Sequence, residues 1–202
     1  MKKCLVIALT LVLALGLLAG CGGKPEPSPY AGAQMGDTLQ LGGIDWYVVK
    51  VDGDNGRALL VSVELLEERQ YHAERENVTW ETCDLRAYLN GEFYDKTFSD
   101  EEKAWIADSE LVNDVSGIEE FETDAGNDTV DRVFLLSIQE AEEYFMDDAA
   151  RKAGDSQQWW LRTPGKLSQT AASYINWWGG IRDGGFNTGN KYWVRPALWL
   201  IV

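Results

Sequence analysis

Two adjacent tryptophan pairs, Trp159-Trp160 and Trp177-Trp178, constrain the fold of this chain more than any other feature. Each pair lies in a run of residues typical of a β-strand, "WWLRTPG" at 159–165 and "ASYINWWGG" at 172–180. Successive side chains of a strand point to opposite faces of a sheet, so neither pair can bury both rings on one face. A sheet built from these runs is therefore either covered on both faces or leaves one tryptophan of each pair at the surface.

Alternation along the strands predicts which ring of each pair is buried. Trp159 shares a face with Leu161, and Trp177 shares a face with Ile175. Both faces are apolar, so we expect Trp159 and Trp177 to lie in the core.

Trp160 and Trp178 fall on the more polar faces and are candidate ligand-binding residues. The glycine-rich segment that follows, "GGIRDGGFNTGN" at 179–190, is expected to form a loop that contacts a ligand. The further ligand-binding candidates from this loop are Arg182, Asp183 and Asn187. The alternative is that all four rings are structural and that long loops cover the second face of the sheet.

Arg162 and Arg195 are the polar residues beside tryptophans in the strand-like runs. Arginine can stack on an aromatic ring as a cation–π partner. It can equally form a bidentate ion pair with a carboxylate inside the fold. The sequence leaves these two roles open.

The first 21 residues, "MKKCLVIALTLVLALGLLAGC", have the layout of a signal peptide, with two lysines followed by a short apolar stretch. The stretch is too short for a comfortable membrane-spanning helix. Its end, "LAGC", resembles the lipobox of bacterial lipoproteins. That resemblance implies removal of residues 1–20 and lipidation of Cys21, which would anchor the protein to the outer side of the cell membrane. The alternative is an ordinary secretory signal with a chance cysteine.

The rest of the chain divides into a tether and one folded domain. Residues 21–36 combine the cysteine with a proline- and glycine-rich stretch, which predicts a flexible tether. Residues 37–202 are expected to form a single domain. The formal net charge of −15 argues against a nucleic-acid partner, because no basic face is available to neutralise phosphates. The same negative charge disfavours attraction to anionic lipid headgroups, so the bilayer is expected as a partner only through the acylated Cys21.

The domain begins with a predicted β-hairpin and continues with helices. Runs at 44–51 and 57–66 flank a "DGDNG" turn. Residues 79–93 predict a helix capped by Thr79 and ended by Asn90-Gly91. Two capping boxes start further helices, one formed by Ser99 and Glu102 and the other by Ser137 and Glu140.

The order of these elements predicts an α+β fold with an antiparallel sheet and two or three helices. The run "DRVFLLS" at 131–137 is expected to be a short buried strand, and the last fifty residues return to strands. The chain lacks the regular alternation of strands and helices that a parallel sheet requires.

Several segments resemble a bacterial family of domains without an assigned function, found on lipoproteins and other surface proteins. The segments are "LRAYLNGEF", "DRVFLLS" with "EAEEYF", "WWLRTPG" and "VRPALWL". That family is distantly similar to the C-type lectin-like fold, which also houses the formylglycine-generating enzymes, so the resemblance implies such a fold here. The calcium-binding triplets of sugar-binding lectins are absent, and Cys83 has no partner for the paired-cysteine chemistry. Neither activity is therefore implied.

Candidate catalytic and metal-binding residues are few. His72 is the single histidine and lies in a polar segment, and no common catalytic motif is present. One acidic segment offers hard oxygen ligands for Ca²⁺. Its candidate ligands are Asp124, Asn127, Asp128 and Asp131. A solvated acidic loop is the alternative, and no cofactor is predicted.

These observations favour a membrane-anchored extracytoplasmic binding module without catalytic activity, whose ligand is a carbohydrate or a peptide. One alternative is an enzyme that modifies the cell envelope with a pair of carboxylates. The other is a structural lipoprotein subunit.

Overall fold

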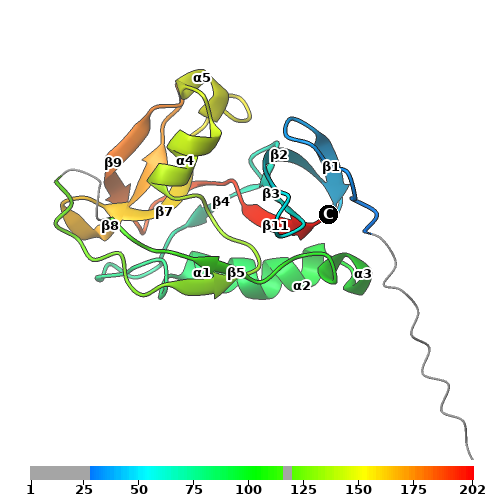
Figure 1. Cartoon of the computed structure of the whole chain (residues 1–202). Coiled ribbons are helices and arrows are strands. Elements are labelled where there is room, and N and C mark those ends of the chain that lie inside the picture. The colour runs from blue at the N-terminus through cyan, green and yellow to red at the C-terminus, as the bar shows by residue number, and fades with distance from the viewer. Residues whose placement is uncertain (1–27, 116–119) are drawn as a thin grey trace, which may run out of the picture.

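The computed structural model describes residues 28–115 and 120–202, so the predicted signal peptide and Cys21 lie outside the described residues. The fold is predominantly β, with 36% strand and 17% helix in several sheets that pack in a sandwich-like arrangement (Figure 1). Residues just ahead of the first strand already bond to the domain. Ser28 Oγ donates a hydrogen bond to the carbonyl of Ile201.

The first sheet has four antiparallel strands in the order β1-β2-β3-β11. The strands are β1 (Thr38–Leu41), β2 (Ile44–Asp52), β3 (Arg57–Ser62) and β11 (Ala197–Ile201). Asp52 pairs with Arg57 at the end of the β2–β3 hairpin, so the predicted hairpin is confirmed. The C-terminal strand β11 pairs with β3 and therefore completes the sheet that the N-terminal strands begin.

The second sheet has five strands in the order β4-β10-β7-β8-β9. They are β4 (Glu67–Gln70), β7 (Trp159–Gly165), β8 (Ser168–Ile175), β9 (Ile181–Asn187) and β10 (Lys191–Val194). β10 and β7 run parallel, paired at Trp193 and Trp159, while the other pairs are antiparallel. β9 is an edge strand, because among the described residues no strand pairs with the side of β9 that faces away from β8.

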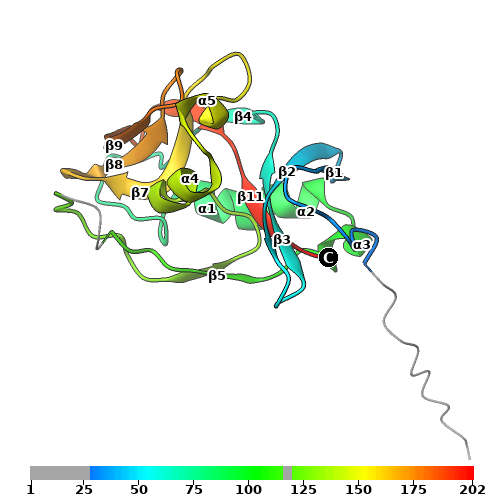
Figure 2. The same cartoon turned by 45° about the horizontal axis from the view of Figure 1, so that its top comes forward.

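Short helices lie on two sides of the sheets. A helical run passes beneath both sheets, and two further helices pack on the other side near β7 (Figures 1 and 2). The run comprises α1 (Asp84–Tyr88), the π-helix η1 (Leu89–Phe93), α2 (Tyr94–Thr97) and α3 (Asp100–Lys103). The remaining elements are α4 (Ile138–Tyr144), α5 (Asp148–Arg151), and the paired strands β5 (Ser109–Leu111) and β6 (Thr129–Asp131). Both predicted capping boxes are present, at the starts of α3 and α4.

The helix predicted over 79–93 begins later and continues further than expected. Cys83, not Thr79, is the N-cap residue, and its Sγ accepts a hydrogen bond from a backbone N–H of the first turn. The expected end at 90–91 is instead the π-helix. There Asn90 accepts from the N–H groups of Arg132 and Val133 and donates to the carbonyl of Val133. These tertiary bonds hold Asn90 inside the helical run and outweigh its local preference for a helix end.

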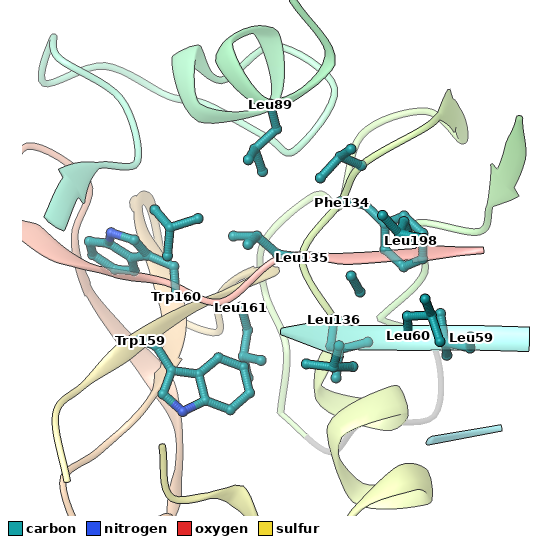
Figure 3. Packing of buried hydrophobic residues seen from close by; sticks show 14 of the residues in the cluster. Leu59, Leu60, Leu89, Phe134, Leu135, Leu136, Trp159, Trp160, Leu161 and Leu198 are labelled. Carbon is teal, nitrogen blue, oxygen red and sulfur yellow. The ribbon is translucent and has the colours of Figure 1, made fainter. Parts of the chain in front are cut away.

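The segment at 131–137 is buried as predicted, apart from the exposed Arg132, but is mostly not a strand. Only Asp131 belongs to β6, and the rest is an extended segment with one isolated bridge between Phe134 and Ala197. Leu135 and Leu136 lie between the two larger sheets, close to Leu161 (Figure 3). The segment therefore joins the sheets into one hydrophobic core.

The expected α+β, C-type lectin-like fold with one antiparallel sheet is wrong. Strand residues outnumber helical ones about two to one, and the strands form separate sheets, one of which contains a parallel pair. The order of elements misled the prediction because it does not say which strands pair. β10 and β11 are separated only by Arg195 and Pro196, yet they belong to different sheets.

Candidate functional site

The first tryptophan pair is entirely within the core. Trp159 and Trp160 both have 0% exposure, and the whole of β7 is buried. The Trp159 indole donates to the carbonyl of Arg151, and the Trp160 indole donates to the carbonyl of Arg69. The expectation that Trp159 is buried is confirmed. Trp160, a predicted ligand-binding residue, has no exposed surface for a ligand, because the rings of Tyr71, Tyr174 and Tyr192 pack against it.

The two arginines beside tryptophans take different structural roles. Arg162 forms a bidentate ion pair with Glu140 on α4. Arg195 instead lies between two rings, 5.0 Å from the centroid of Phe145 and 5.2 Å from that of Trp159. Burial lowers the pKa of Arg195 to about 10, so its guanidinium stays charged at neutral pH. Both side chains therefore bond or stack with groups inside the fold.

The second tryptophan pair is at the surface. Trp177 is 53% exposed and Trp178 is 43% exposed, and their ring centroids lie 4.6 Å apart in an edge-to-face arrangement. The expectation that Trp177 is buried was wrong. β8 ends at Ile175, so the alternation of strand side chains does not extend to the turn that carries the two rings.

The turn between β8 and β9 is held by the side chain of Asn176, which is 2% exposed. Its Oδ1 accepts hydrogen bonds from the N–H of Trp178 at 3.1 Å and the N–H of Gly180 at 2.9 Å. The Asn176 backbone N–H also donates to the carbonyl of Gly180. An asparagine that bonds to the backbone of its own turn is a common device for fixing a tight loop.

The same turn packs directly on α5. Gly179 has φ +91°, a conformation that glycine adopts without a steric penalty. Its carbonyl accepts a hydrogen bond from Arg151 Nε at 2.9 Å, and Arg151 is in turn ion-paired with Asp148. The exposed tryptophans are therefore presented on a turn fixed both internally and by a helix.

The turn continues into a cluster of partly exposed rings on β8, β9 and β10. Arg182 stacks on Trp178, with its guanidinium carbon 5.1 Å from the ring centroid, and is the cross-strand partner of Tyr174. Tyr192 lies 4.8 Å from Tyr174 and is stacked on Phe186 at 5.2 Å with a 13° interplanar angle. We call this cluster the aromatic surface, which comprises Tyr174, Trp177, Trp178, Arg182, Phe186 and Tyr192.

The phenol of Tyr192 is a neutral hydrogen-bonding group in the aromatic surface. Burial, together with the neighbouring Tyr174, raises the pKa of Tyr192 well above its usual value of 10. The surface thus combines apolar rings with tyrosine hydroxyls and one cation, Arg182. Such a combination suits a ligand with both apolar patches and polar groups.

Two of the predicted ligand-binding residues have other partners. Asp183 forms an ion pair with Lys166 at 3.0 Å. Burial acts to raise the pKa of Asp183, but the bonds from Lys166 and from the Gly184 N–H together lower it. Asn187 caps the following turn, where its Oδ1 accepts from the Gly189 N–H at 3.0 Å. Of the predicted ligand-binding residues, the structure brings together Trp178 and Arg182.

The expected glycine-rich loop is in fact the edge strand β9. Glycine is uncommon in strands, but here it allows close contact with the β7–β8 hairpin. Gly185 has φ +72°, and a Cβ there would lie 2.8 Å from the Cα of Gly165. The strand brings Phe186 into the aromatic surface, a position that the glycine-rich sequence gave no reason to expect.

The four candidate calcium ligands do not converge. Each bonds to a different part of the protein, and Asp131 is buried in a network of its own. The partners are Gly126 N–H for Asp124, Glu81 for Asn127, Asn113 N–H for Asp128, and Arg86 with Trp80 for Asp131. Across 28–115 and 120–202, no group of three or more His, Cys, Asp or Glu residues is placed to hold a metal ion.

His72 and Cys83 lie near each other in sequence and are both buried. The His72 ring nitrogens face two carboxylates, those of Glu76 and Asp84, each at 3.1 Å. Burial raises the pKa of the Cys83 thiol to about 12, which keeps it protonated at neutral pH. A protonated, buried thiol is a poor nucleophile and a poor metal ligand.

The family of the chain is clear from its sequence. Residues 55–202 match the family model of DUF6273, a domain of unknown function, and the chain belongs to this family. A comparison with curated proteins and a comparison with solved structures each gave no match. No helix within the part of the chain that the structure describes is long and apolar enough to cross a membrane.

Proposed function

We propose that this protein is an extracytoplasmic binding module whose aromatic surface binds a carbohydrate. The observation that carries the proposal is the exposure of Trp177 and Trp178 on a turn that Asn176 and α5 hold in place. Exposed rings of this size keep apolar area in contact with water, and a ligand that covers them gains free energy. Because the turn is already ordered, little conformational entropy is lost on binding.

The shape of the aromatic surface favours a sugar over a compact small molecule. The rings are spread over a turn and three strands instead of lining a deep cavity. The C–H groups of a sugar ring pack well against the electron-rich face of an indole or phenol. Arg182 and the tyrosine hydroxyls supply hydrogen-bonding groups for the sugar's oxygen atoms.

The open edge of β9 favours a second candidate, an extended peptide. Such a peptide can add to a sheet edge through main-chain hydrogen bonds while its side chains contact neighbouring pockets. Phe186 and Arg182 would then contact the side chains of the peptide. The two candidates differ in a measurable way, because strand addition uses the backbone of β9 and sugar stacking uses the rings of Trp177 and Trp178.

A glycan array tests the carbohydrate proposal on a soluble form that begins at residue 22. We expect binding to a subset of glycans and its loss in a Trp177→Ala/Trp178→Ala variant. Tyr47→Ala is the matched control, since Tyr47 is an exposed aromatic on β2 in the other large sheet. An array on which the two variants and the parent protein behave alike would overturn the proposal.

We also propose that Cys21 carries a lipid that anchors the protein to the cell membrane. The support is the signal-peptide layout and the "LAGC" sequence. Stable anchoring requires more than one acyl chain, as lipoprotein processing supplies. Cys21→Ala should move the protein from the membrane fraction to the soluble fraction. Unchanged fractionation would refute the anchor.

A further inference from the structure

The side-chain amide of Asn176 has hydrogen-bond partners for its oxygen but, among the described residues, none for its nitrogen. Its oxygen accepts two backbone hydrogen bonds, which fixes the orientation of the amide. Its nitrogen, Nδ2, is buried and has no hydrogen-bond partner among the described residues. A buried donor without an acceptor is unfavourable and is uncommon in folded proteins. The unused Nδ2 therefore requires an explanation.

The indole nitrogen of Trp178, Nε1, is a second donor that lies near Asn176 Nδ2. A Cβ built on Gly180 would lie 3.2 Å from Asn176 Nδ2 and 3.1 Å from Trp178 Nε1. The two nitrogens thus lie on the side of residue 180 that a side chain would occupy, and a Cβ there would contact both of them more closely than is usual. The indoles of the buried tryptophans each donate to a protein acceptor, whereas within the described chain Trp178 Nε1 has none. The buried tryptophans are Trp46, Trp80, Trp159 and Trp160.

The charge that stacks on Trp178 is positive. The Arg182 guanidinium lies over the ring of Trp178, and among the described residues no carboxylate is within ion-pair distance of it. All three groups are hydrogen-bond donors, so their common ligand must be an acceptor. A carboxylate has two acceptor oxygens, carries the opposite charge and makes stronger hydrogen bonds than a neutral group.

We propose that Asn176, Trp178 and Arg182 form a carboxylate-binding subsite beside Gly180, and that the ligand of the aromatic surface is an acidic carbohydrate. This inference rests on the proposed carbohydrate-binding function. The sugar ring stacks on the exposed tryptophans while its carboxylate meets the three donors. The overall charge of −15 repels anions at long range, so recognition depends on these short-range contacts.

Three substitutions separate the subsite from the stacking surface. Asn176→Asp keeps an oxygen for the N–H groups of Trp178 and Gly180 but replaces Nδ2 with a second oxygen that repels a carboxylate. Trp178→Phe keeps an aromatic ring and removes Nε1. Gly180→Ala places a methyl group in the space between the donors, at a residue whose φ is not in the left-handed region.

The test uses titration calorimetry with oligogalacturonate and with its methyl ester, which has the same sugar rings and no charge. We expect the parent protein to bind the acid at least about tenfold more tightly than the ester. Asn176→Asp, Trp178→Phe and Gly180→Ala should each lower the ratio of the affinity for the acid to the affinity for the ester, because each removes or covers a donor that only the charged carboxylate uses fully. Arg75→Gln, which changes an exposed arginine on the 71–78 loop, is the charge control. Thermal melts establish that each variant is folded.

Other outcomes separate the subsite from the broader proposal. If the acid and the ester bind equally, and neither Asn176→Asp nor Gly180→Ala changes this, the proposal of a carboxylate-binding subsite is wrong. The proposal that the protein binds a carbohydrate would then still stand. Binding of neither sugar, together with a silent glycan array, would overturn both proposals. A peptide that binds through its terminal carboxylate, when neither sugar binds, would show that the subsite takes a carboxylate from a protein. This outcome would overturn the proposal that the ligand is an acidic carbohydrate.

Discussion

The carbonyl oxygen of Asp148 occupies the place where a side chain on Gly179 would begin. An ideal Cβ on Gly179 would lie 1.6 Å from that oxygen, which is far closer than any non-bonded contact allows. The helix α5 and the β8–β9 turn are therefore packed backbone to backbone, with Arg151 bonded across the contact. This contact positions the exposed tryptophans.

Gly179→Ala should therefore disrupt the aromatic surface. The new methyl group clashes with backbone, which cannot rotate away, and alanine disfavours the positive φ at this position. We expect a loss of about 1–3 kcal/mol in the free energy of unfolding, measured by urea denaturation, and a loss of ligand binding. Gly184→Ala on β9 is the matched control, because a Cβ there meets nothing within 4 Å. Equal stability of the two variants would contradict this account.

Cys83 should resist alkylation in the folded protein. Burial raises its pKa to about 12, so almost no thiolate is present at pH 8, and the thiol is also shielded from solvent. We expect iodoacetamide to label the soluble form from residue 22 only in denaturant, as measured by mass spectrometry. Labelling of Cys83 in buffer at a rate similar to that in denaturant would show that the site opens readily.

Asn90 should be a stabilising residue although it is only half-buried. Its side chain bonds to three backbone groups of the neighbouring segment, at Arg132 and Val133, which leads into the core. Asn90→Ala leaves these groups without partners and should lower the free energy of unfolding by about 2 kcal/mol. Asn90→Asp keeps the acceptor and should lower it less. A thermal melt of each variant compares them.

Local signals in the sequence predicted local structure well. The capping boxes at Ser99 and Ser137 and the β2–β3 hairpin are present because neighbouring residues alone determine them. Where a prediction from local signals was wrong, tertiary contacts determined the structure instead. Asn90-Gly91 is typical of a helix end, but hydrogen bonds from Asn90 to the segment at Arg132 keep the chain helical there.

The candidate site was only partly predictable for a similar reason. Tyr174 was not among the predicted ligand-binding residues, although strand alternation puts it on the same face as Asn176 and Trp178 and would have allowed its prediction. Alternation failed for Trp177, because the strand ends before that residue. Phe186 lies among glycines, and only the packing of β9 against the β7–β8 hairpin explains why that stretch is a strand.

The stability of the contact between α3 and the β1–β2 turn should depend on pH through Glu102. Its carboxylate accepts from the N–H of Gly42 at 2.7 Å and from the N–H and hydroxyl of Ser99. These bonds, that from Gly42 first, lower the pKa of Glu102 below its usual value of 4.5. A carboxylate with a lowered folded-state pKa stabilises the protein above its unfolded-state pKa, and the contribution is lost as the pH falls through the folded-state value.

Glu102→Gln should therefore lower the free energy of unfolding by about 1 kcal/mol at pH 7, the usual size of a helix-capping contribution. The difference from the parent protein should shrink as the pH falls below 4.5, the usual pKa of the group. Urea denaturation at pH 7 and at pH 3 measures both values. Glu101→Gln is the control, since the neighbouring Glu101 is exposed in the same first helical turn. A constant difference at the two pH values would show that shape alone, and not the charge on Glu102, holds α3 to the turn.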